Sequence, residues 1–265
     1  MSEPRINAPL RSPLHGANAS LPEMTAVLLV GGKGSRLRPV LPSTPKPLAR
    51  VGDYSFLELL IRQLRHQGIC KLVMCTGYLG SQIEDEFGDG QHLGVAIRYS
   101  KESTPLGTAG ALKLAKHLLD DCTEFLVLNG DSFIKLDFGR LIKFHRQRAG
   151  LAALAVTPVD NAARYGTVKL NCDGRVISLM EKSGTSGPGL VNAGVYIFNQ
   201  AILDYIEESP SSLERDVIPC ILNCGVFALQ EDGFFIDIGT PQDYALANAI
   251  SHRLHSAAFD LETGH

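Results

Sequence analysis

The sequence predicts an α/β fold, with a doubly wound, mostly parallel sheet followed by an antiparallel lobe. Three observations carry this prediction. Apolar runs typical of buried strands alternate with helix-like runs between Met24 and Pro158. After Pro158 the strand-like runs follow one another across short turns, which indicates antiparallel pairing. The chain has 265 residues, 45% of them apolar and 20% charged, which is enough to bury the core of one large domain.

The alternating part begins and ends with a strand. Strands separated by helices at this spacing pair in parallel through right-handed crossovers, and this predicts the doubly wound sheet. In chain order the predicted elements are the strand Ala26–Val30, the helix Phe56–His66, the strand Lys71–Cys75, the helix Ser81–Phe87, the strand Ala96–Ser100, the helix Thr108–Leu119, the strand Phe125–Asn129, the helix Phe138–Gln147 and the strand Ala152–Pro158.

Hairpins replace crossovers in the second part, which suggests a lobe laid over the edge of the first sheet. Its predicted elements are strands at Tyr165–Leu170, Val176–Glu181 and Val191–Phe198, helices at Gln200–Glu207 and Ser212–Leu222, a strand at Val226–Leu229 and a final helix at Pro241–His255. We expect residues 1–23 to be a mobile N-terminal extension and 24–255 a single domain, followed by a tail at 256–265. Within the domain, 24–158, 159–240 and 241–255 form three successive parts.

Composition excludes several classes of protein. A formal net charge of −3 with scattered basic residues gives no field for nucleic acid. No apolar run approaches the ~20 residues of a membrane span, and no signal peptide is visible, so no membrane partner and a cytoplasmic location are expected. The six cysteines show no Cys-x-x-Cys pair, which predicts buried reduced thiols and not disulfides or zinc.

A glycine-rich segment, Gly31–Pro39 (GGKGSRLRP), follows the strand Ala26–Val30 directly. Ligands bind at the carboxyl ends of parallel strands, and glycines there expose backbone N–H groups to phosphate oxygens. Arg36 and Lys46 add cationic donors, so a polyphosphate ligand is predicted. The spacing matches neither a P-loop nor a dinucleotide fingerprint, which disfavours a nicotinamide oxidoreductase. A tight turn with two solvated cations is the alternative.

Two aspartates are candidates for holding a metal ion. Asp131 follows the buried strand Phe125–Asn129, and Asp237 lies in an apolar run just before the final helix. Joining two anionic substrates requires charge neutralisation, which a divalent cation held by carboxylates supplies. Taken alone, each aspartate fits a helix cap or a turn equally well.

Segments Gly31–Pro39 and Thr44–Leu48 (TPKPL) together resemble the signature of the sugar-1-phosphate nucleotidyltransferases. The resemblance extends from about Met24 to Leu246 and implies a Rossmann-like nucleotide-binding part with a sugar-binding lobe. It implies transfer of a nucleotidyl group from a nucleoside triphosphate to a sugar 1-phosphate, with release of pyrophosphate. Of the residues matched, Arg36, Lys46 and Asp131 would be catalytic, and Asp131 and Asp237 would bind Mg²⁺.

The resemblance also implies a nucleotide subsite, and favours GTP. The Gly-Thr-Ala-Gly form at residues 107–110 looks more like enzymes that make GDP-sugars than like thymidylyltransferases. A carboxylate accepts hydrogen bonds only and guanine presents two adjacent donors, so Glu102 could select guanine; a solvated glutamate is the alternative. The nucleotide-binding residues predicted are Leu29, Gly31, Gly32, Gly34, Ser35, Arg36, Lys46, Glu102, Gly107, Thr108 and Gly130.

Three further segments match the family's sugar-phosphate pocket. They predict that Lys182 meets the phosphate, that Glu181 and Asn192 meet sugar hydroxyls, and that the backbone of Gly166 meets another. The full predicted set is Tyr165, Gly166, Glu181, Lys182, Asn192 and Gly194. The family usually has proline after this lysine, whereas Ser183 stands here, which puts the wall of the pocket in question.

Among family members, the chain looks most like the guanylyltransferases for D-glycero-D-manno-heptose 1-phosphate. This rests on the segments Leu190–Tyr196 and Phe235–Tyr244 and on the Pro-Leu-Gly-Thr-Ala-Gly run. The alternatives are a mannose 1-phosphate guanylyltransferase and a glucose 1-phosphate thymidylyl-, uridylyl- or cytidylyltransferase. A non-catalytic nucleotide-sugar sensor is a remote alternative. Apolar residues of the second part fit either a core or an interface, so the sequence leaves a homo-oligomer open.

Overall fold

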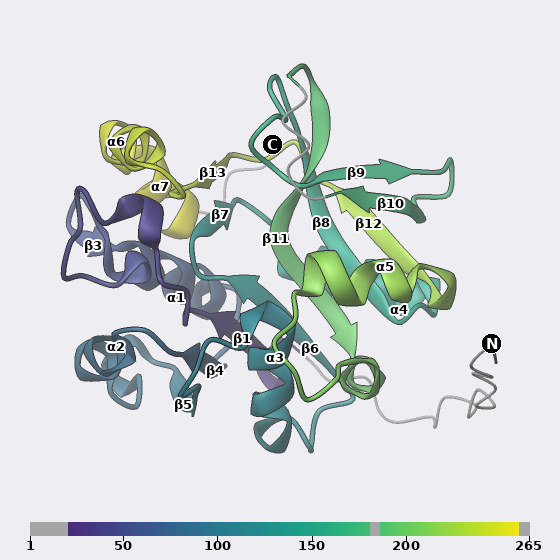
Figure 1. Ribbon diagram of the computed structural model, residues 1–265, viewed down its shortest axis with the longest axis horizontal. Helices are drawn as coiled ribbons and strands as arrows, with labels where there is room; N and C mark the ends of the chain where they lie inside the picture. The colour runs from purple at the N-terminus through teal and green to yellow at the C-terminus, as the bar shows by residue number, and fades with distance from the viewer. Residues whose placement is uncertain (1–20, 181–185, 260–265) are drawn as a thin grey trace.

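The computed structural model describes residues 21–180 and 186–259. Within these ranges nine strands form one central sheet, along which the main path of hydrogen-bonded neighbours is β10-β9-β11-β6-β1-β4-β5, while β8 pairs with β11 and β12 (Figure 1). The predicted α/β class with a mostly parallel, helix-covered sheet is confirmed. The segments 1–20 and 260–265, where most of the predicted extension and tail fall, lie outside the described residues.

Four neighbouring strands of the sheet, β6-β1-β4-β5, pair in parallel. Its strands are β1 (Thr25–Leu29), β4 (Lys71–Thr76), β5 (Ala96–Lys101) and β6 (Glu124–Asn129), and its helices are α1 (Phe56–His66), α2 (Gly80–Phe87), α3 (Gly107–Leu114) and α4 (Phe138–Arg148). The predicted α1 has the bounds of the observed helix. The predicted helix Thr108–Leu119 is shorter as an α-helix, because its last turn, Ala115–Leu118, is a 3-10 turn.

The strands of the second part, together with β8, extend the same sheet instead of covering its edge. They are β8 (Ala152–Val159), β9 (Thr167–Leu170), β10 (Val176–Met180), β11 (Gly189–Asn199) and β12 (Val226–Gln230). Strand β11 pairs antiparallel with β6 on one side and with β8 and β9 on the other. Strand β8 is therefore parallel to β6, as the alternating pattern predicts, but β11 lies between them. Strand β12 pairs in parallel with β8.

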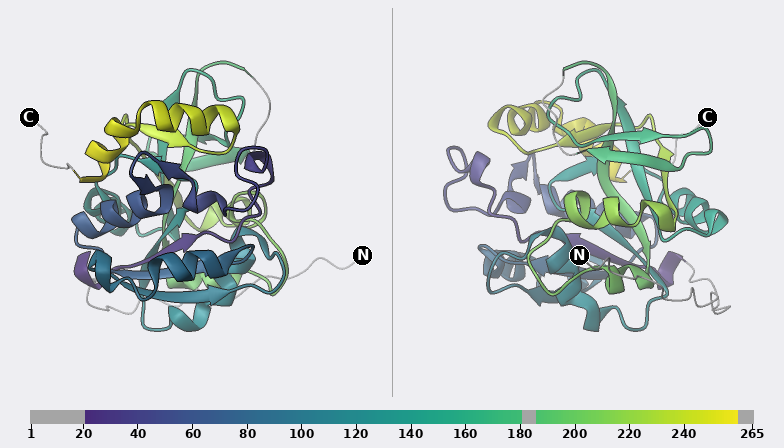
Figure 2. Two further views of the ribbon diagram at one scale, coloured as in Figure 1. Left: turned by 90° about the vertical axis from the view of Figure 1, so that its left-hand side faces the viewer. Right: turned by 45° about the vertical axis from the view of Figure 1, so that its right-hand side comes forward.

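The C-terminal part differs from its prediction in detail. The predicted final helix is two helices, α6 (Pro241–Ala249) and α7 (Ser251–Phe259), separated by Ile250, and α7 runs beyond the predicted end at His255. Helix α7 packs on α1 (Figure 2). Of the two helices predicted before β12, the first is a 3-10 helix at Gln200–Tyr205. The second is helical but irregular: it is π-helical at Leu213–Val217, continues as α5 (Ile218–Cys220) and is followed by a 3-10 turn at Leu222–Cys224.

Two short strand pairs and several 3-10 turns complete the described chain. Strands β2 (Arg50–Val51) and β3 (Tyr54–Ser55) form a hairpin, and β7 (Ser132–Ile134) pairs with β13 (Phe235–Asp237). None of these was predicted, because two or three residues carry no readable periodicity. The remaining 3-10 turns are Leu21–Glu23, Ser35–Leu37, Lys46–Leu48 and Gln91–Leu93.

Side chains alternate between two cores, one on each face of the sheet. On β1, Ala26 and Leu28 join the core that contains helices α1, α2 and α4, while Val27 joins the core that contains α3 and α5. A strand buried on both faces is expected to be apolar throughout, and all three side chains are fully buried. The sheet is thus fixed from both sides, and its carboxyl ends are held firmly in place.

Helix α4 offers a test of local stability. The Asp137 carboxylate accepts a hydrogen bond of 3.0 Å from the backbone N–H of Arg140, which caps the helix. We expect Asp137→Ala to lower the free energy of unfolding by about 1 kcal/mol, since an N-cap substitution costs ~0.5–2 kcal/mol. Urea unfolding measures this change. Asp137→Asn retains the acceptor and is the control; equal losses in both variants would contradict the capping role.

The cysteines correct one expectation. All six are free, as predicted, and Cys75 is buried, but Cys172, Cys220 and Cys224 are exposed. Cys172 lies on the turn between β9 and β10, and Cys220 and Cys224 end short helical segments between β11 and β12. No helix in the described ranges has the length and apolar character needed to cross a membrane.

Candidate active site

Two adjoining cavities open at the carboxyl ends of β1 and β6. The first has a volume of about 380 Å³ and the second about 350 Å³. Five residues line both cavities: Arg36, Gly107, Thr108, Asn129 and Asp131. Two ligands seated in them would therefore meet beside these shared residues. This is the crevice in which open α/β sheets bind ligands.

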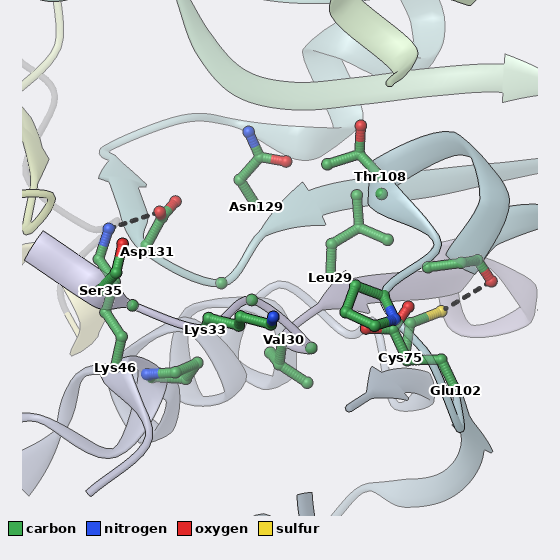
Figure 3. A pocket seen from close by; sticks show the side chains of 18 of the residues that line it. Leu29, Val30, Lys33, Ser35, Lys46, Cys75, Glu102, Thr108, Asn129 and Asp131 are labelled. Carbon is green, nitrogen blue, oxygen red and sulfur yellow. Dashed lines mark hydrogen bonds and ion pairs between the residues drawn. The ribbon is translucent and has the colours of Figure 1, made fainter. Parts of the chain in front are cut away.

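All eleven residues predicted to bind the nucleotide line the first cavity. Figure 3 shows the Lys46–Asp131 pair at one end of this cavity and Glu102 at the other. The glycine loop forms the wall between them. Gly34 has a φ of +57°, and a Cβ there would lie 3.0 Å from the Cβ of Lys46, so a side chain would be strained and crowded. The loop can lie this close to Lys46 because residue 34 is glycine.

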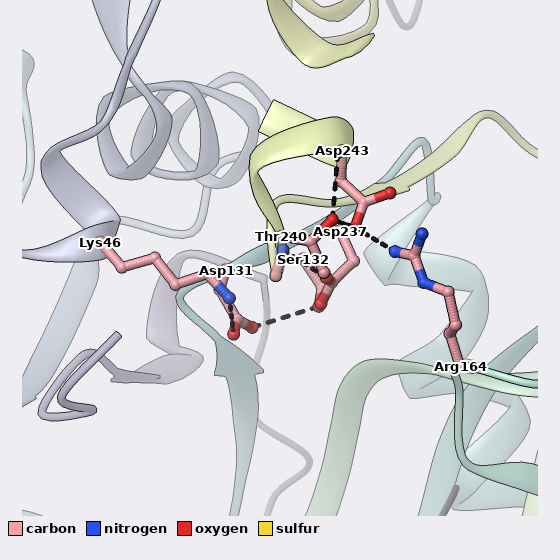
Figure 4. A network of polar contacts seen from close by, with 8 residues as sticks. Lys46, Asp131, Ser132, Arg164, Asp237, Thr240 and Asp243 are labelled. Carbon is pink, nitrogen blue, oxygen red and sulfur yellow. Dashed lines mark hydrogen bonds and ion pairs between the residues drawn. The ribbon is translucent and has the colours of Figure 1, made fainter. Parts of the chain in front are cut away.

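The two aspartates come together through a strand pair that local pattern does not reveal. Strands β7 and β13 place Asp237 opposite Ser132, the neighbour of Asp131. The Ser132 hydroxyl lies 3.3 Å from Asp131 Oδ1 and 3.3 Å from Asp237 Oδ2, so it bridges the two carboxylates (Figure 4). The backbone N–H of Gly239 donates to Asp237 Oδ1 at 2.6 Å.

Lys46 neutralises part of this charge. Its Nζ lies 2.6 Å from Asp131 Oδ2, and the two side chains are 13% and 35% exposed. This ion pair joins the segment after the glycine loop to the end of β6. Partial burial makes the pair stronger than a surface salt bridge, because solvent screens it less.

The donor set at this point fits Mg²⁺. Among the described residues no group of three or more His, Cys, Asp or Glu side chains could hold a metal ion. Mg²⁺ does not need one, because it is usually bound by one or two carboxylates together with substrate phosphates and water. Asp131 and Asp237, bridged by Ser132, supply two carboxylates in the wall of a cavity with a basic loop.

Glu102 lies in the first cavity and is half-buried. Its Oε2 accepts a hydrogen bond of 3.0 Å from the backbone N–H of Leu106. A Cβ at Gly31 or Gly77 would lie 2.9 or 2.4 Å from Oε1, so both glycines make room for the carboxylate. Burial raises the pKa of Glu102, and the Leu106 N–H partly opposes this. Glu102 is therefore not a solvated surface glutamate.

The second cavity contains four of the six residues predicted to bind the sugar phosphate: Tyr165, Gly166, Asn192 and Gly194. The other two, Glu181 and Lys182, lie outside the described residues. Asn192 Oδ1 accepts from the backbone N–H of Gly194 at 3.0 Å. Gly194 has a φ of +74°, and a Cβ there would lie 3.0 Å from the Asn129 side chain. This glycine thus lets β11 pass close to β6.

Several lining residues were not predicted. Asn129 lies two residues before Asp131 and lines the second cavity. It could have been predicted from the sequence, because it is the polar residue that ends the apolar run of β6. Arg164 pairs with Asp243, which also accepts from the Thr240 hydroxyl at 2.7 Å (Figure 4). Glu214 lies on the turn Leu213–Val217. No sequence signal singles out Arg164 or Glu214, because each depends on a distant partner.

Comparisons with known proteins agree on one family. The family model described as "Nucleotidyl transferase" matches residues 25–253. The mannose-1-phosphate guanylyltransferase catalytic subunit beta of Dictyostelium discoideum is 37% identical over 226 residues, which cover 83% of this chain and 62% of the relative. Probable mannose-1-phosphate guanylyltransferase 1 of Oryza sativa subsp. japonica is 38% identical over 226 residues, covering 83% and 63%. The chain thus spans about three fifths of these relatives' length.

Solved structures show the same fold. The crystal structure of HddC from Yersinia pseudotuberculosis is 31% identical, with a TM-score of 0.77 over 86% of this chain and 99% of HddC. HddC has also been solved in complex with GMP-PN. A putative glucose-1-phosphate thymidylyltransferase from Bacillus anthracis, 23% identical, aligns over 91% of this chain and 98% of its own with a TM-score of 0.78, which extends the likeness of fold alone.

Proposed function

The chain belongs to the nucleotidyl transferase family, and from this premise we propose that it transfers a guanylyl group from GTP to a sugar 1-phosphate, giving a GDP-sugar and pyrophosphate. The observation that carries the proposal is the pair of adjoining cavities that share Arg36 and Asp131. In such a site the sugar phosphate can approach the α-phosphorus of GTP while both substrates stay bound. Fixing the two reactants in this way removes much of the entropic cost of reaction.

We propose that the glycine loop and Lys46 bind the triphosphate. The loop lines the first cavity, and Gly32 faces open space, since a Cβ at this residue would have no neighbouring atom within 4 Å. Backbone N–H groups of such a loop can contact phosphate oxygens directly. Arg36 lines both cavities, so its guanidinium is placed to stabilise charge that develops between the two substrates.

Asp131 and Asp237 would hold Mg²⁺. When bound, the ion would lower the repulsion between the two phosphates and polarise the α-phosphate. Lys46 pairs with Asp131 at 2.6 Å, so this lysine is already beside the carboxylate that the triphosphate approaches. Its ammonium can contact phosphate oxygens and balance their charge. The Ser132 hydroxyl lies between the two carboxylates and can donate its single proton to either one.

For the acceptor, we propose D-glycero-D-manno-heptose 1-phosphate, with mannose 1-phosphate as the second candidate. The first rests on the resemblance of Leu190–Tyr196 and Phe235–Tyr244; the second is supported by the names of the curated relatives. We propose that Tyr165, Gly166, Asn192 and Gly194 bind the sugar phosphate together with Glu181 and Lys182. On this proposal residues 24–158 bind the nucleotide and 159–240 the sugar phosphate.

A matrix of four nucleoside triphosphates against several sugar 1-phosphates, read by pyrophosphate release, tests the proposal. We expect release with GTP and heptose 1-phosphate, and weaker release with mannose 1-phosphate. Faster reaction with another base would reject GTP, and faster reaction with mannose or glucose 1-phosphate would reject the heptose. Nucleotide-sugar binding without release under any condition would identify a sensor instead.

A substitution at Glu102 tests the choice of base. We expect Glu102→Gln to lower kcat/KM for GTP by about 10-fold or more, because a charge-assisted hydrogen bond worth ~1.5–3 kcal/mol is lost and an amide donor faces a guanine donor. The amide oxygen can still accept from Leu106, so the loop is preserved. Glu86→Gln, on the exposed face of α2, is the control. If the ratio of GTP to ATP activity in Glu102→Gln equals that of the wild type, Glu102 does not select guanine.

A further inference from the structure

Glu214 joins the two cavities through hydroxyl groups. It lines the second cavity from the turn Leu213–Val217. Its Oε2 lies 3.0 Å from Thr108 Oγ1 and 2.8 Å from Ser212 Oγ, and its Oε1 lies 2.9 Å from the Tyr196 hydroxyl. Thr108 also lines the nucleotide cavity, and Tyr196 leads to the sugar cavity. One carboxylate thus contacts residues from both sides of the site.

A carboxylate fixes the direction of every hydrogen bond around it. It can only accept, so the Thr108, Ser212 and Tyr196 hydroxyls must each direct their single proton to Glu214. Any other partner of these hydroxyls must then be a donor. The contacts obey this rule: the backbone N–H of Leu213 donates to Thr108 Oγ1 at 2.8 Å.

The same rule sets the orientation of Asn192. Because the Tyr196 proton goes to Glu214, the Tyr196 oxygen accepts, and Asn192 Nδ2 donates to it at 2.7 Å. At the other end of the amide, Asn192 Oδ1 accepts from the backbone N–H of Gly194 at 3.0 Å. A flipped Asn192 would set donor against donor at Gly194, so the amide has one favourable orientation.

The Tyr196 hydroxyl is a rigid intermediary in this chain of contacts. The side chain is fully buried, and its ring stacks on Phe198 with centroids 5.6 Å apart and planes at 11°. A ring held in this way fixes the position of the hydroxyl oxygen, so that only its proton can change direction. Because the proton points to Glu214, the fixed oxygen presents a lone pair to Asn192 Nδ2.

We propose that Glu214 is a positioning residue that, together with the backbone N–H of Gly194, holds the donor and acceptor sides of the Asn192 amide toward one sugar hydroxyl, and thereby determines which sugar 1-phosphate is selected. The inference rests on the proposed function, since it assigns the second cavity to the sugar phosphate. Glu214 need not touch the substrate. Its effect passes through Tyr196 to the Asn192 amide. The hydrogen bond from Thr108 to Glu214 links this group of residues to the first cavity, which Thr108 also lines.

Glu214→Gln is the decisive variant, because it keeps the shape but replaces one acceptor with a donor. If the new N–H faces Tyr196, the Tyr196 proton must turn toward Asn192 Nδ2, and the amide keeps only its anchor at the Gly194 N–H. We expect the KM for the sugar 1-phosphate to rise about 10-fold, while kcat and the KM for GTP change less than about threefold. Tyr196→Phe keeps the ring, removes the hydroxyl and is expected to shift the same KM.

A set of monodeoxy sugar 1-phosphates separates positioning from simple loss of structure. The wild type should lose affinity sharply for the sugar that lacks the hydroxyl facing Asn192, whereas Glu214→Gln should discriminate weakly between that sugar and the parent. Asp216→Asn is the matched control, because Asp216 accepts from the Ser212 N–H at 2.7 Å in the same turn. It should behave as wild type toward every sugar.

Three outcomes would overturn the inference: unchanged sugar selectivity in Glu214→Gln, an equal rise in the KM for GTP, or the same defect in Asp216→Asn. Calorimetric titration of sugar 1-phosphate into each protein gives the same comparison without turnover. If the wild type binds the sugars but releases no pyrophosphate with any triphosphate, the proposed function fails. The calorimetric ranking of wild type, Glu214→Gln and Asp216→Asn still decides the role of Glu214 in that case.

Discussion

Asp131→Asn is expected to abolish turnover while leaving the fold intact. The substitution keeps the side chain's shape but removes the charge that faces Lys46 and that would help to hold Mg²⁺. Because a bound metal ion contributes several kcal/mol to stabilising the transition state, we expect kcat to fall about 10³-fold or more. The Asp131 side chain is 35% exposed, so little packing is at stake.

Pyrophosphate release across a titration of Mg²⁺ measures this effect, and thermal unfolding checks the fold. Asp232→Asn, an exposed carboxylate on the turn before β13, is the matched control and should retain full activity. Lys46 loses its partner in the Asp131 variant, so a small change in the melting temperature is expected. An Asp131→Asn protein with magnesium-dependent activity close to wild type would rule out the assignment.

Arg36→Lys is expected to have the second largest effect. Arg36 is exposed on the 3-10 turn Ser35–Leu37 and lines both cavities, whereas its neighbour Leu37 is buried and anchors the turn. The guanidinium presents a planar fork of donors that can contact two phosphate oxygens at once, and an ammonium cannot. We expect kcat to fall about 10²-fold, the size seen when one aligned donor is lost from a transition state.

Steady-state kinetics with both substrates separate this loss from weaker binding. A fall in kcat at saturating GTP indicates a role in the transition state, and a rise in the KM for GTP alone indicates ground-state binding. Arg38→Lys provides the control two residues along the chain, where the guanidinium lies 5.1 Å from the Tyr78 ring outside both cavities. Activity within threefold of wild type in Arg36→Lys would contradict a catalytic role.

The parts of the fold that could be predicted are those specified by neighbouring residues. Helix α1 begins at Phe56, after Ser55, whose hydroxyl accepts from the N–H of Glu58, and its apolar positions repeat with helical spacing. The pairing of β7 with β13 could not be predicted, because it joins residues about a hundred positions apart through three-residue strands. The position of β11 between β6 and β8 is similarly a matter of long-range pairing.

The candidate site divides in the same way. The residues predicted from the glycine loop lie together in one cavity because the loop is short and begins at a strand end. Glu214 acquires its partners only when β11 brings Tyr196 to it and α3 brings Thr108. A glutamate in a short helical turn has no distinguishing pattern of its own. Its place in the site follows from tertiary structure alone.

Strand β11 has a consequence for how sugar preference can be altered. It carries Asn192 and Gly194, which line the second cavity. Its backbone is hydrogen-bonded to β6, β8 and β9, and β6 also ends at the first cavity. The segment that we propose to face the sugar is therefore not a unit that can be exchanged on its own. Grafting it from a relative would disturb hydrogen bonds along three neighbouring strands, so preference is better redesigned by replacing single side chains on an intact strand.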